Sequence, residues 1–550
     1  MFISRWFKNK KQKNQAQAVA PHQVVEKHKD QKVKGNIADT LQFIQEILGE
    51  NDDLIIRRFH VFGLYDAVMI YFSNFVDIQQ VNEDILKPLM QVPRHLEGKK
   101  FNSSQLKEVL IEDILYHSAI QSESQIEKII HAIVRGETII LAEGLDDALV
   151  IPTRKVDKRA IDQPGTEQTI RGPREGFIEQ IGTNIALLRY RLQTPDFRVK
   201  TMEIGRISKS KVVICYLEGI ANPDLIEEVK DRLSAIDIDA VLDAGYLEQY
   251  IEDHHFSPFP QIQNTERPDK AVAQILEGRV VILVDGSPFG LIVPTVFHQF
   301  YQTSEDYVER FIMSSAIRLV RLVSLFFSLI TSSLYVAIIS YNPELIPTQF
   351  AVAVAGGRAG VPFPAVVEVF LMEVIMEILR EATVRLPQQV GGALSIVGVL
   401  VIGQAAVSAG FVSPITVVVI ALTTIGSFAT PAYNAAMALR LLRFPIIFMA
   451  GTFGLYGLMV GVILIINHML SLRSFGVPYM SPIVPGNFQG MKDIIIRGPH
   501  WWMPKRPASL HTRNRNRLGD RIQEFKEAPS NTLDPVNVGN ERGNVDGDTT

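Results

Sequence analysis

The pattern of apolar and polar positions divides the chain into two parts. Over about the first 300 residues, short apolar runs alternate with polar segments, as in water-soluble domains. From residue 310 to 485 apolar residues dominate, and residues 386–439 form a 54-residue run without Asp, Glu, Lys, Arg or His. A helix crosses a bilayer with about 20 apolar residues, so this run alone can hold two crossings. The pattern predicts an α/β soluble domain followed by an α-helical transmembrane domain.

Two segments of the soluble part repeat one pattern. Residues 136–153 read GETIILAEGLDDALVIPT, and residues 278–295 read GRVVILVDGSPFGLIVPT. Each reads as two strands joined by a glycine-containing turn, which is a β-hairpin. Comparable strand and helix patterns precede both copies. We therefore expect two related α/β subdomains in tandem, over residues 38–160 and 195–300.

A connector over residues 161–194 separates the two predicted subdomains. It begins as a loop rich in Pro and Gly and continues as a helical pattern. Three of its arginines, Arg171, Arg174 and Arg189, are candidates for a subdomain interface, where they would pair with acids or bind an anion. The alternative is a solvated connector with surface salt bridges.

Both ends of the chain are polar. Residues 1–37 form a basic tail, with nine Lys/Arg and two acids among the first 36 residues. This tail is expected to be disordered, or else to be an electrostatic tether to anionic lipid. Residues 486–550 form a polar C-terminal tail that is expected to be disordered beyond about residue 510.

Composition narrows the classes of function. A net charge of −4 over 550 residues gives no reason to expect nucleic acid as a partner. The single cysteine, Cys215, lies in an apolar run, which predicts a buried side chain on a strand and excludes a disulfide within one chain. The sequence contains no phosphate-binding loop, zinc-protease motif or nucleophile elbow, so we expect neither an enzyme nor a cofactor or metal site.

The apolar part offers four or five membrane crossings. Four candidate spans are residues 322–343, 390–411, 414–431 and 444–472. Basic residues precede the first span and follow the last, so the positive-inside rule places both ends in the cytoplasm. Arg440 and Arg443 conflict with this arrangement, because four spans would leave them outside. A fifth crossing by residues 362–385 would bring them inside but would export the C-terminus, and both topologies stay open.

The most unusual segment is an acidic helix between apolar runs. Pro362 and Pro364 suit its start, and its periodicity places Glu373, Glu377 and Glu381 within about 100° of arc. Ionisable groups at membrane depth usually face a pore or each other, and rings of carboxylates favour cations. The alternative is an interfacial amphipathic helix whose charges pair internally.

At these residues the chain resembles the GerA family of spore germination receptors, specifically the A subunit. The resemblance runs from about Leu54 to Pro507. Matching stretches are IRGPREGFIEQIGTNIALLRYRL (170–192), EGRVVILVDGSPF (277–289), GRAGVPFP (357–364), MEILREATVRLP (376–387) and SFGVPYMSPIVP (474–485). The resemblance implies an integral protein of the spore inner membrane, and with the positive-inside rule we expect a multi-pass protein whose large N-terminal domain lies in the cytoplasm.

The resemblance also implies partners and site residues. A permease-like B subunit would hold the nutrient site, and a lipoprotein C subunit would complete the receptor. Copies of the A subunit would form a homo-oligomer that acts as a nutrient-gated channel, releasing monovalent cations to start germination. The motif GRAGVPFP would supply a gate-proximal turn of Arg358, Gly360, Pro362 and Pro364, and the acidic helix would line the ion pathway.

Two other interpretations stay open. An accessory channel paralogue of the same family would amplify ion release without direct nutrient coupling, although the long C-terminal tail favours the receptor subunit. A secondary transporter with a soluble regulatory domain is a different class of protein. The small number of spans, without an inverted repeat among them, argues against a transporter.

Overall fold

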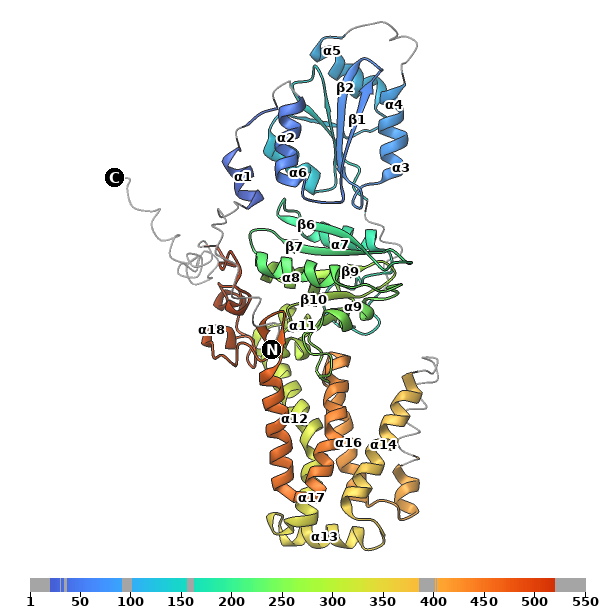
Figure 1. Cartoon of the computed structure of the whole chain (residues 1–550), viewed down its shortest axis with the longest axis vertical. Helices are drawn as coiled ribbons and strands as arrows, with labels where there is room; N and C mark the ends of the chain where they lie inside the picture. Colours follow the sequence, from blue (N-terminus) through green and yellow to red (C-terminus); the bar gives the residue numbers. More distant parts are fainter. Residues whose placement is uncertain are drawn as a thin grey trace, which may run out of the picture.

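A computed structural model describes residues 20–29, 31–33, 37–91, 101–155, 163–384, 401 and 403–519. The molecule is elongated, with two sheet-containing units stacked above a bundle of helices (Figure 1). The segment that follows the last long helix returns to the side of the second unit, where it is coloured red (Figure 1).

The first unit is an antiparallel five-stranded sheet with helices on both faces. Its strands are β1 (Leu54–Val61), β2 (Tyr65–Phe72), β3 (Gln121–Glu123), β4 (Thr138–Ala142) and β5 (Ala148–Ile151), in the order β1-β2-β4-β5-β3. One face is covered by α1 (Pro21–Lys27), α2 (Ile37–Leu48) and α6 (Ile126–Val134), and the other by α3 (Ile78–Gln80), η2 (Val81–Leu86), α4 (Lys87–Met90), α5 (Ser103–Glu108) and η4 (Val109–Ile114). Side chains of β2 alternate between the two cores, so the sheet is buried on both faces.

The second unit has the same architecture. Its strands are β6 (Phe197–Ile204), β7 (Ser210–Leu217), β8 (Gln263–Thr265), β9 (Val280–Val284) and β10 (Gly290–Val293), in the order β6-β7-β9-β10-β8. Helices α7 (Ile181–Arg191) and α10 (Pro268–Glu277) cover one face, and α8 (Pro223–Ser234) and α9 (Ala244–Ile251) cover the other. Cys215 is fully buried on β7, as predicted, and this burial raises the pKa of its thiol.

Both hairpins predicted from the repeated segments are present. Strands β4 and β5 pair antiparallel, and so do β9 and β10. The turn glycines Gly144 and Gly286 have φ of +86° and +87°, a conformation that favours glycine, so their recurrence reflects turn geometry. Helix α7 packs against the second sheet through Ile185 and Leu188. The predicted connector 161–194 therefore ends in the first helix of the second unit.

Order extends further toward both ends than the sequence predicted. Disorder over residues 1–37 is wrong for residues 20–29, because α1 places Val25 in the first core and His22 against Asp196, with Nδ1 2.6 Å from Oδ2. The prediction of disorder beyond residue 510 is wrong for residues 511–519, because the backbone amide of Arg513 donates to the carbonyl of Ile220 in the second unit. Residues 1–19 and 520–550 lie outside the described residues.

Besides the helical residues 403–408, the described part of the chain contains the main helices of the bundle. They are α12 (Phe311–Tyr341), α13 (Thr348–Arg358), α14 (Ala365–Val384), α16 (Pro414–Phe428) and α17 (Tyr433–Ser471). Two of them, α12 and α17, are long and apolar enough to cross a membrane, and α16 is a shorter apolar helix. Most of the predicted span 390–411 lies outside the described residues.

Helix α17 consists of two antiparallel legs. At its middle, Gly454 has φ 60° and ψ −142°, which is far from the helical region. A Cβ atom on Gly461 would lie 3.5 Å from Ile446, whereas a straight helix would separate these residues by about 22 Å. The turn lies beside Tyr341 at the end of α12. The predicted single span 444–472 is therefore wrong, because the chain reverses inside it.

Contacts at its ends show where α17 begins and finishes. Before the helix, the amide of Ala432 donates to the carbonyl of Phe300, and after it the carbonyl of Tyr479 accepts from Phe297. Phe300, the acceptor, and Phe297, the donor, both belong to η6 (Phe297–Tyr301), which follows the second sheet. Both legs of α17 thus reach the end of the bundle that faces the second unit, while α13 lies across the opposite end (Figure 1).

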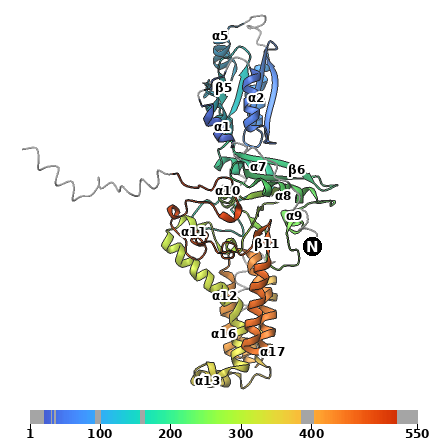
Figure 2. The same ribbon diagram turned by 60° about the vertical axis from the view of Figure 1, so that its left-hand side comes forward.

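The last segment of the chain lies along the second unit and the start of α12. Its elements are β11 (Arg473–Ser474), β12 (Val477–Pro478), α18 (Phe488–Met491), η8 (His500–Trp502) and η9 (Ala508–Leu510). Earlier in the chain, α11 (Glu305–Val308) precedes α12 and η7 (Pro343–Leu345) follows it. Figure 2 shows α12 inclined away from the other helices at its first turns, with α11 beside it.

Candidate functional site

Helix α14 carries a series of carboxylates into the interior of the bundle. We call Glu368, Glu373 and Glu377 the carboxylate ladder, since they follow one another along the helix at intervals of about 6–8 Å. Each accepts from at least one arginine. The arginines come from α13, α17 and α14 itself, so the ladder connects most of the bundle.

The first rung is Glu368, which is fully buried near the end that α13 covers. Its carboxylate accepts from Arg358 Nη2 at 3.0 Å, from the backbone amide of Ser413 at 3.0 Å and from the hydroxyl of Thr416 at 3.0 Å. These donors belong to the end of α13 and the start of α16, so one carboxylate holds three segments together. Sequence reasoning singled out Arg358 but missed Glu368, because it lies outside the acidic arc that the periodicity defined.

The second rung is the ion pair between Glu373 and Arg443 of α17. The distance from Oε2 to Nη1 is 2.5 Å, and both side chains are 2% exposed. The other oxygen of Glu373 accepts from Ser332 Oγ at 2.7 Å. Within the described residues, Nε and Nη2 of Arg443 have no hydrogen-bond partner, which leaves donors available beside this carboxylate.

The third rung is Glu377, which accepts from Arg380 at 2.5 Å and lies 3.3 Å from Nε of Arg440. Glu381 follows on the exposed end of α14. Arg440 and Arg443, which conflicted with the predicted topologies, are thus buried partners of the ladder.

The ladder is electrically compensated within one chain. A buried charge is tolerated in an apolar interior only with a counter-charge and hydrogen bonds, and the first two rungs have both. The sequence predicted carboxylates that face a pore or one another. The structure instead directs Glu373 toward α17, so any ion path along α14 would have to compete with its arginine.

The predicted gate-proximal turn lies at the same end as the first rung. Arg358 ends α13, while Pro362 and Pro364 are exposed and precede α14, which begins at Ala365 as its prolines predicted. A Cβ atom on Gly410 would come 3.2 Å from the carbonyl oxygen of Gly360. This close approach, with a φ of +70° at Gly410, explains the glycine at position 410, whereas a Cβ atom on Gly360 would meet open space.

The three candidate interface arginines are not together. Arg189 is buried between the two units, where Nε and Nη2 lie 2.7 and 2.6 Å from the carboxylate of Asp53. Its guanidinium also lies 3.7 Å from the ring centroid of Phe72. Arg171 instead pairs with Glu309, which precedes α12, at 3.3 Å, and Arg174 is exposed.

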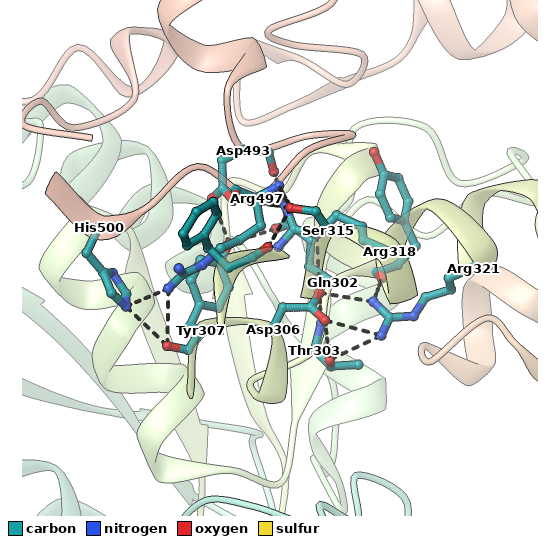
Figure 3. A network of polar contacts seen from close by, with 12 residues as sticks. Gln302, Thr303, Asp306, Tyr307, Ser315, Arg318, Arg321, Asp493, Arg497 and His500 are labelled. Carbon is teal, nitrogen blue, oxygen red and sulfur yellow. Dashed lines mark hydrogen bonds and ion pairs between the residues drawn. The ribbon is translucent and has the colours of Figure 1, made fainter. Parts of the chain in front are cut away.

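A second network joins α11 and the C-terminal segment to the first turns of α12 (Figure 3). Asp306 of α11 accepts from Arg318 at 3.3 Å and from Arg321 at 3.0 Å, both on the first turns of α12. Asp493, from the C-terminal segment, accepts from Arg318 at 2.9 Å and from the hydroxyl of Tyr307 at 2.7 Å. Burial and the Asp493 carboxylate raise the pKa of Tyr307, so its hydroxyl stays a donor.

A polar cavity of about 320 Å³ lies between the two units. Its lining includes Asn74 and Lys155 from the first unit, and Gly182, Thr183 and Asp285 from the second. Lys155 lies 3.1 Å from Asp77. In the part of the chain that the structure describes, no group of three or more His, Cys, Asp or Glu side chains is placed to hold a metal ion.

Comparisons with known proteins agree with the resemblance found in the sequence. The family described as "Bacillus/Clostridium GerA spore germination protein" matches residues 42–509. Spore germination protein KA of Bacillus subtilis (strain 168) is 42% identical, over 93% of this chain and 92% of its own. The uncharacterized membrane protein YfkQ of the same organism is 38% identical, over 92% and 97%.

One solved structure also matches. The crystal structure of the N-terminal domain of the A subunit of the Bacillus megaterium spore germinant receptor GerK3 is 32% identical, with a TM-score of 0.38. It covers 48% of this chain and 97% of that domain. The family match spans most of the chain, and both relatives align over nearly their full lengths. The chain therefore belongs to the GerA family of spore germination proteins.

Proposed function

We propose that this chain is the A subunit of a nutrient-sensing spore germination receptor. Copies of it would oligomerise to form or gate a monovalent-cation channel in the spore inner membrane. The observation that carries the proposal is the carboxylate ladder, which places paired charges along the inside of an apolar bundle. Ionisable residues at membrane depth are costly and mark ion pathways.

The exposed apolar surface of the bundle supports assembly. Helix α13 has one buried residue, Val354, among its described side chains, and Phe350 and Val352 are exposed. The helix lies across the end of the bundle rather than within it (Figure 1). Neighbouring copies would cover this surface and bring the gate-proximal turns together. A permease-like B subunit and a lipoprotein C subunit would be the further partners.

The course of the chain supports a topology with both ends on one side. The first turns of α12 and the segment after α17 meet at the end of the bundle next to the second unit. Arg310 precedes α12, and Arg473, Lys492 and Lys505 follow α17, so the positive-inside rule favours a cytoplasmic position for this end of the bundle and for the two sheet units. The shared strand order of these units fits an origin by duplication of one subdomain.

In this proposal the ladder is closed by its arginines and opens when they move. Glu373 is released for cation binding only if α14 and α17 shift relative to each other, because its partner Arg443 is on α17. A signal that moves the bundle would therefore exchange an internal counter-charge for a mobile cation. The free energy of the two pairings can be similar, since a buried ion pair is close to balanced against its desolvation.

The test is the conductance of the purified, reconstituted protein in planar bilayers. We expect a cation-selective conductance, with a reversal potential approaching about 59 mV for a tenfold KCl gradient. The variant Glu373→Gln/Glu377→Gln/Glu381→Gln should bring this potential toward zero. The matched control Leu371→Gln places the same amide on the exposed side of α14 and should change nothing.

Two outcomes would contradict the proposal. An unchanged reversal potential in the triple variant would exclude the acidic residues as the selective element. An intact wild-type oligomer that passes no current would contradict a channel built by this chain alone. The compensated variant Glu373→Gln/Arg443→Gln, which leaves no unpaired charge, separates loss of selectivity from loss of folding.

A further inference from the structure

The segment that follows α17 presents two different sides. We call residues 491–502 the C-terminal clamp. On its inner side, Ile494 and Arg497 are buried, and Asp493 holds Arg318 and Tyr307 in the network of Figure 3. The backbone carbonyl of Arg497 also accepts from Ser315, 3.2 Å away on α12. The inner side is thus fixed to the first turns of α12.

The outer side of the clamp consists of large apolar residues. Ile496 is 64% exposed, Trp501 47% and Trp502 57%, and Ile495 is also exposed. A side chain of this size that stays in water loses the stabilisation that burial would give. Asp493 and Arg497 are turned toward α12 while the apolar residues are exposed, with Lys492 and His500 exposed beside them, so the exposure of the apolar side is a feature of the clamp's fold.

This apolar surface continues onto α12. The ring of Trp501 lies 6.5 Å from the ring of Phe311 in an edge-to-face contact, and the next residues, Ile312 and Met313, are exposed as well. Further along the same helix, Phe326 and Phe327 are exposed. The outer side of the clamp and the outer side of α12 therefore form one apolar surface.

The length of α12 places the clamp at the boundary of a bilayer. Its 31 residues extend for about 46 Å, against a hydrocarbon core of about 30 Å, so even an inclined helix has turns outside the core. The clamp contacts these first turns, beside α11 (Figure 2). Tryptophan is enriched at this depth of a membrane because its ring is apolar and its N–H is polar.

The charges near the clamp complete the argument. Lys492 and Lys505 are exposed on either side of the apolar residues. Exposed cations beside a membrane surface attract anionic headgroups. Asp493, which would be repelled by such headgroups, is turned inward onto Arg318.

We propose that the outer side of the C-terminal clamp is a membrane-anchoring surface, with Ile495, Ile496, Trp501 and Trp502 inserted among the anionic headgroups of the leaflet that α12 enters. The inference rests on α12 crossing the bilayer, which is part of the proposed function. It fixes the start of α12 and the network of Figure 3 to the membrane surface. Movement of the sheet units would then act on the bundle against a fixed point.

The experiment uses the full chain in nanodiscs that contain phosphatidylglycerol. Since the chain has three tryptophans, Trp6→Phe leaves only Trp501 and Trp502 as emitters. Lipids brominated near the headgroup should reduce this emission by about twofold, and lipids brominated deep in the chain should reduce it less. Aqueous iodide should quench weakly. Lys492→Gln/Lys505→Gln should reduce the shallow quenching.

Two reporters separate failure of this inference from failure of the proposed function. With all three native tryptophans changed to Phe, Phe326→Trp reports whether α12 crosses the bilayer and should be quenched by deep bromine. Tyr116→Trp, on the exposed surface of the first unit, should respond to iodide alone.

Deep quenching at position 326 together with strong iodide quenching of Trp501 and Trp502 would overturn the anchor while leaving the span intact. Protection of Trp501 and Trp502 from both iodide and bromine would also overturn it, because protein would then cover the clamp. Loss of deep quenching at position 326 would contradict the span itself, and the anchor with it.

Discussion

A buried arginine contributes an ion pair to the contact between the two sheet units, so Arg189→Ala should weaken this contact. Arg189 is 2% exposed and holds Asp53 through two hydrogen bonds, with the ring of Phe72 against its guanidinium. The same interface contains backbone bonds that form only when the units are in contact. The amide of Asp52 donates to the carbonyl of Val199, and the amide of Val199 donates to the side chain of Asn51.

The expected effect is large because truncation leaves a buried carboxylate without its counter-charge. Removing one partner of a buried ion pair costs roughly 3–5 kcal/mol. At about 1.4 kcal/mol for each factor of ten, this corresponds to roughly 150- to 4,000-fold more frequent opening of the interface. The amides of Asp52 and Val199 should exchange with deuterium faster by a similar factor.

Hydrogen exchange of the full chain in nanodiscs measures this opening at individual peptides. Arg206→Ala is the matched control, because Arg206 is 63% exposed and its pair with Asp239 should contribute no more than about 1 kcal/mol. Arg189→Met/Asp53→Leu should recover part of the loss, since it leaves no buried charge. The reasoning is refuted if Arg189→Ala changes these amides no more than the control does, or accelerates exchange equally throughout both sheets.

Three further predictions concern single positions. Burial, together with the carboxylates of Glu252 and Asp243, raises the pKa of Glu248 to about 7. The folded chain therefore binds an extra proton between about pH 4.5 and 7 and loses stability as pH rises through that range. Thermal melts should show this loss, and Glu248→Gln should abolish it. Gly454→Ala forces a side chain into φ 60°, ψ −142° and should lower stability by about 1–3 kcal/mol in detergent, whereas Gly356→Ala, with open space around it, should not. Cys215 should react with a thiol dye only after the second sheet unfolds, and dye labelling of the native protein would contradict its burial.

The local sequence was sufficient to predict the hairpins but insufficient to predict what packs beside them. The repeated glycines set the turns of β4–β5 and β9–β10, because only a few residue types adopt positive φ. The assignment of α7 to the second unit depends on contacts of Ile185 and Leu188 with strands that follow later in the chain. Periodicity identifies an apolar face, but it does not identify the sheet that this face covers.

The candidate site shows the same limit more strongly. Periodicity grouped Glu373, Glu377 and Glu381, since they share one arc of a helix. The partners of Glu368 and Glu373 come from other helices, so Glu368 escaped notice even though it accepts three hydrogen bonds, as many as Glu373. A buried carboxylate is recognised by its donors, and those donors are supplied by tertiary structure.

Arg440 and Arg443 conflicted with the predicted topologies because they were taken to indicate which side of the membrane their segment lies on. The positive-inside rule concerns arginines in loops, whereas these two are buried in α17 and pair with α14. With that role assigned, they place no constraint on topology, and Gly454 supplies the reversal that the apolar pattern hid. The second leg of α17 returns the chain to the second unit, so the arginines before the bundle and the lysines after it lie at one end. We infer that the two sheet units and the C-terminal clamp occupy the same side of the membrane, and a reporter fused at either end should respond alike.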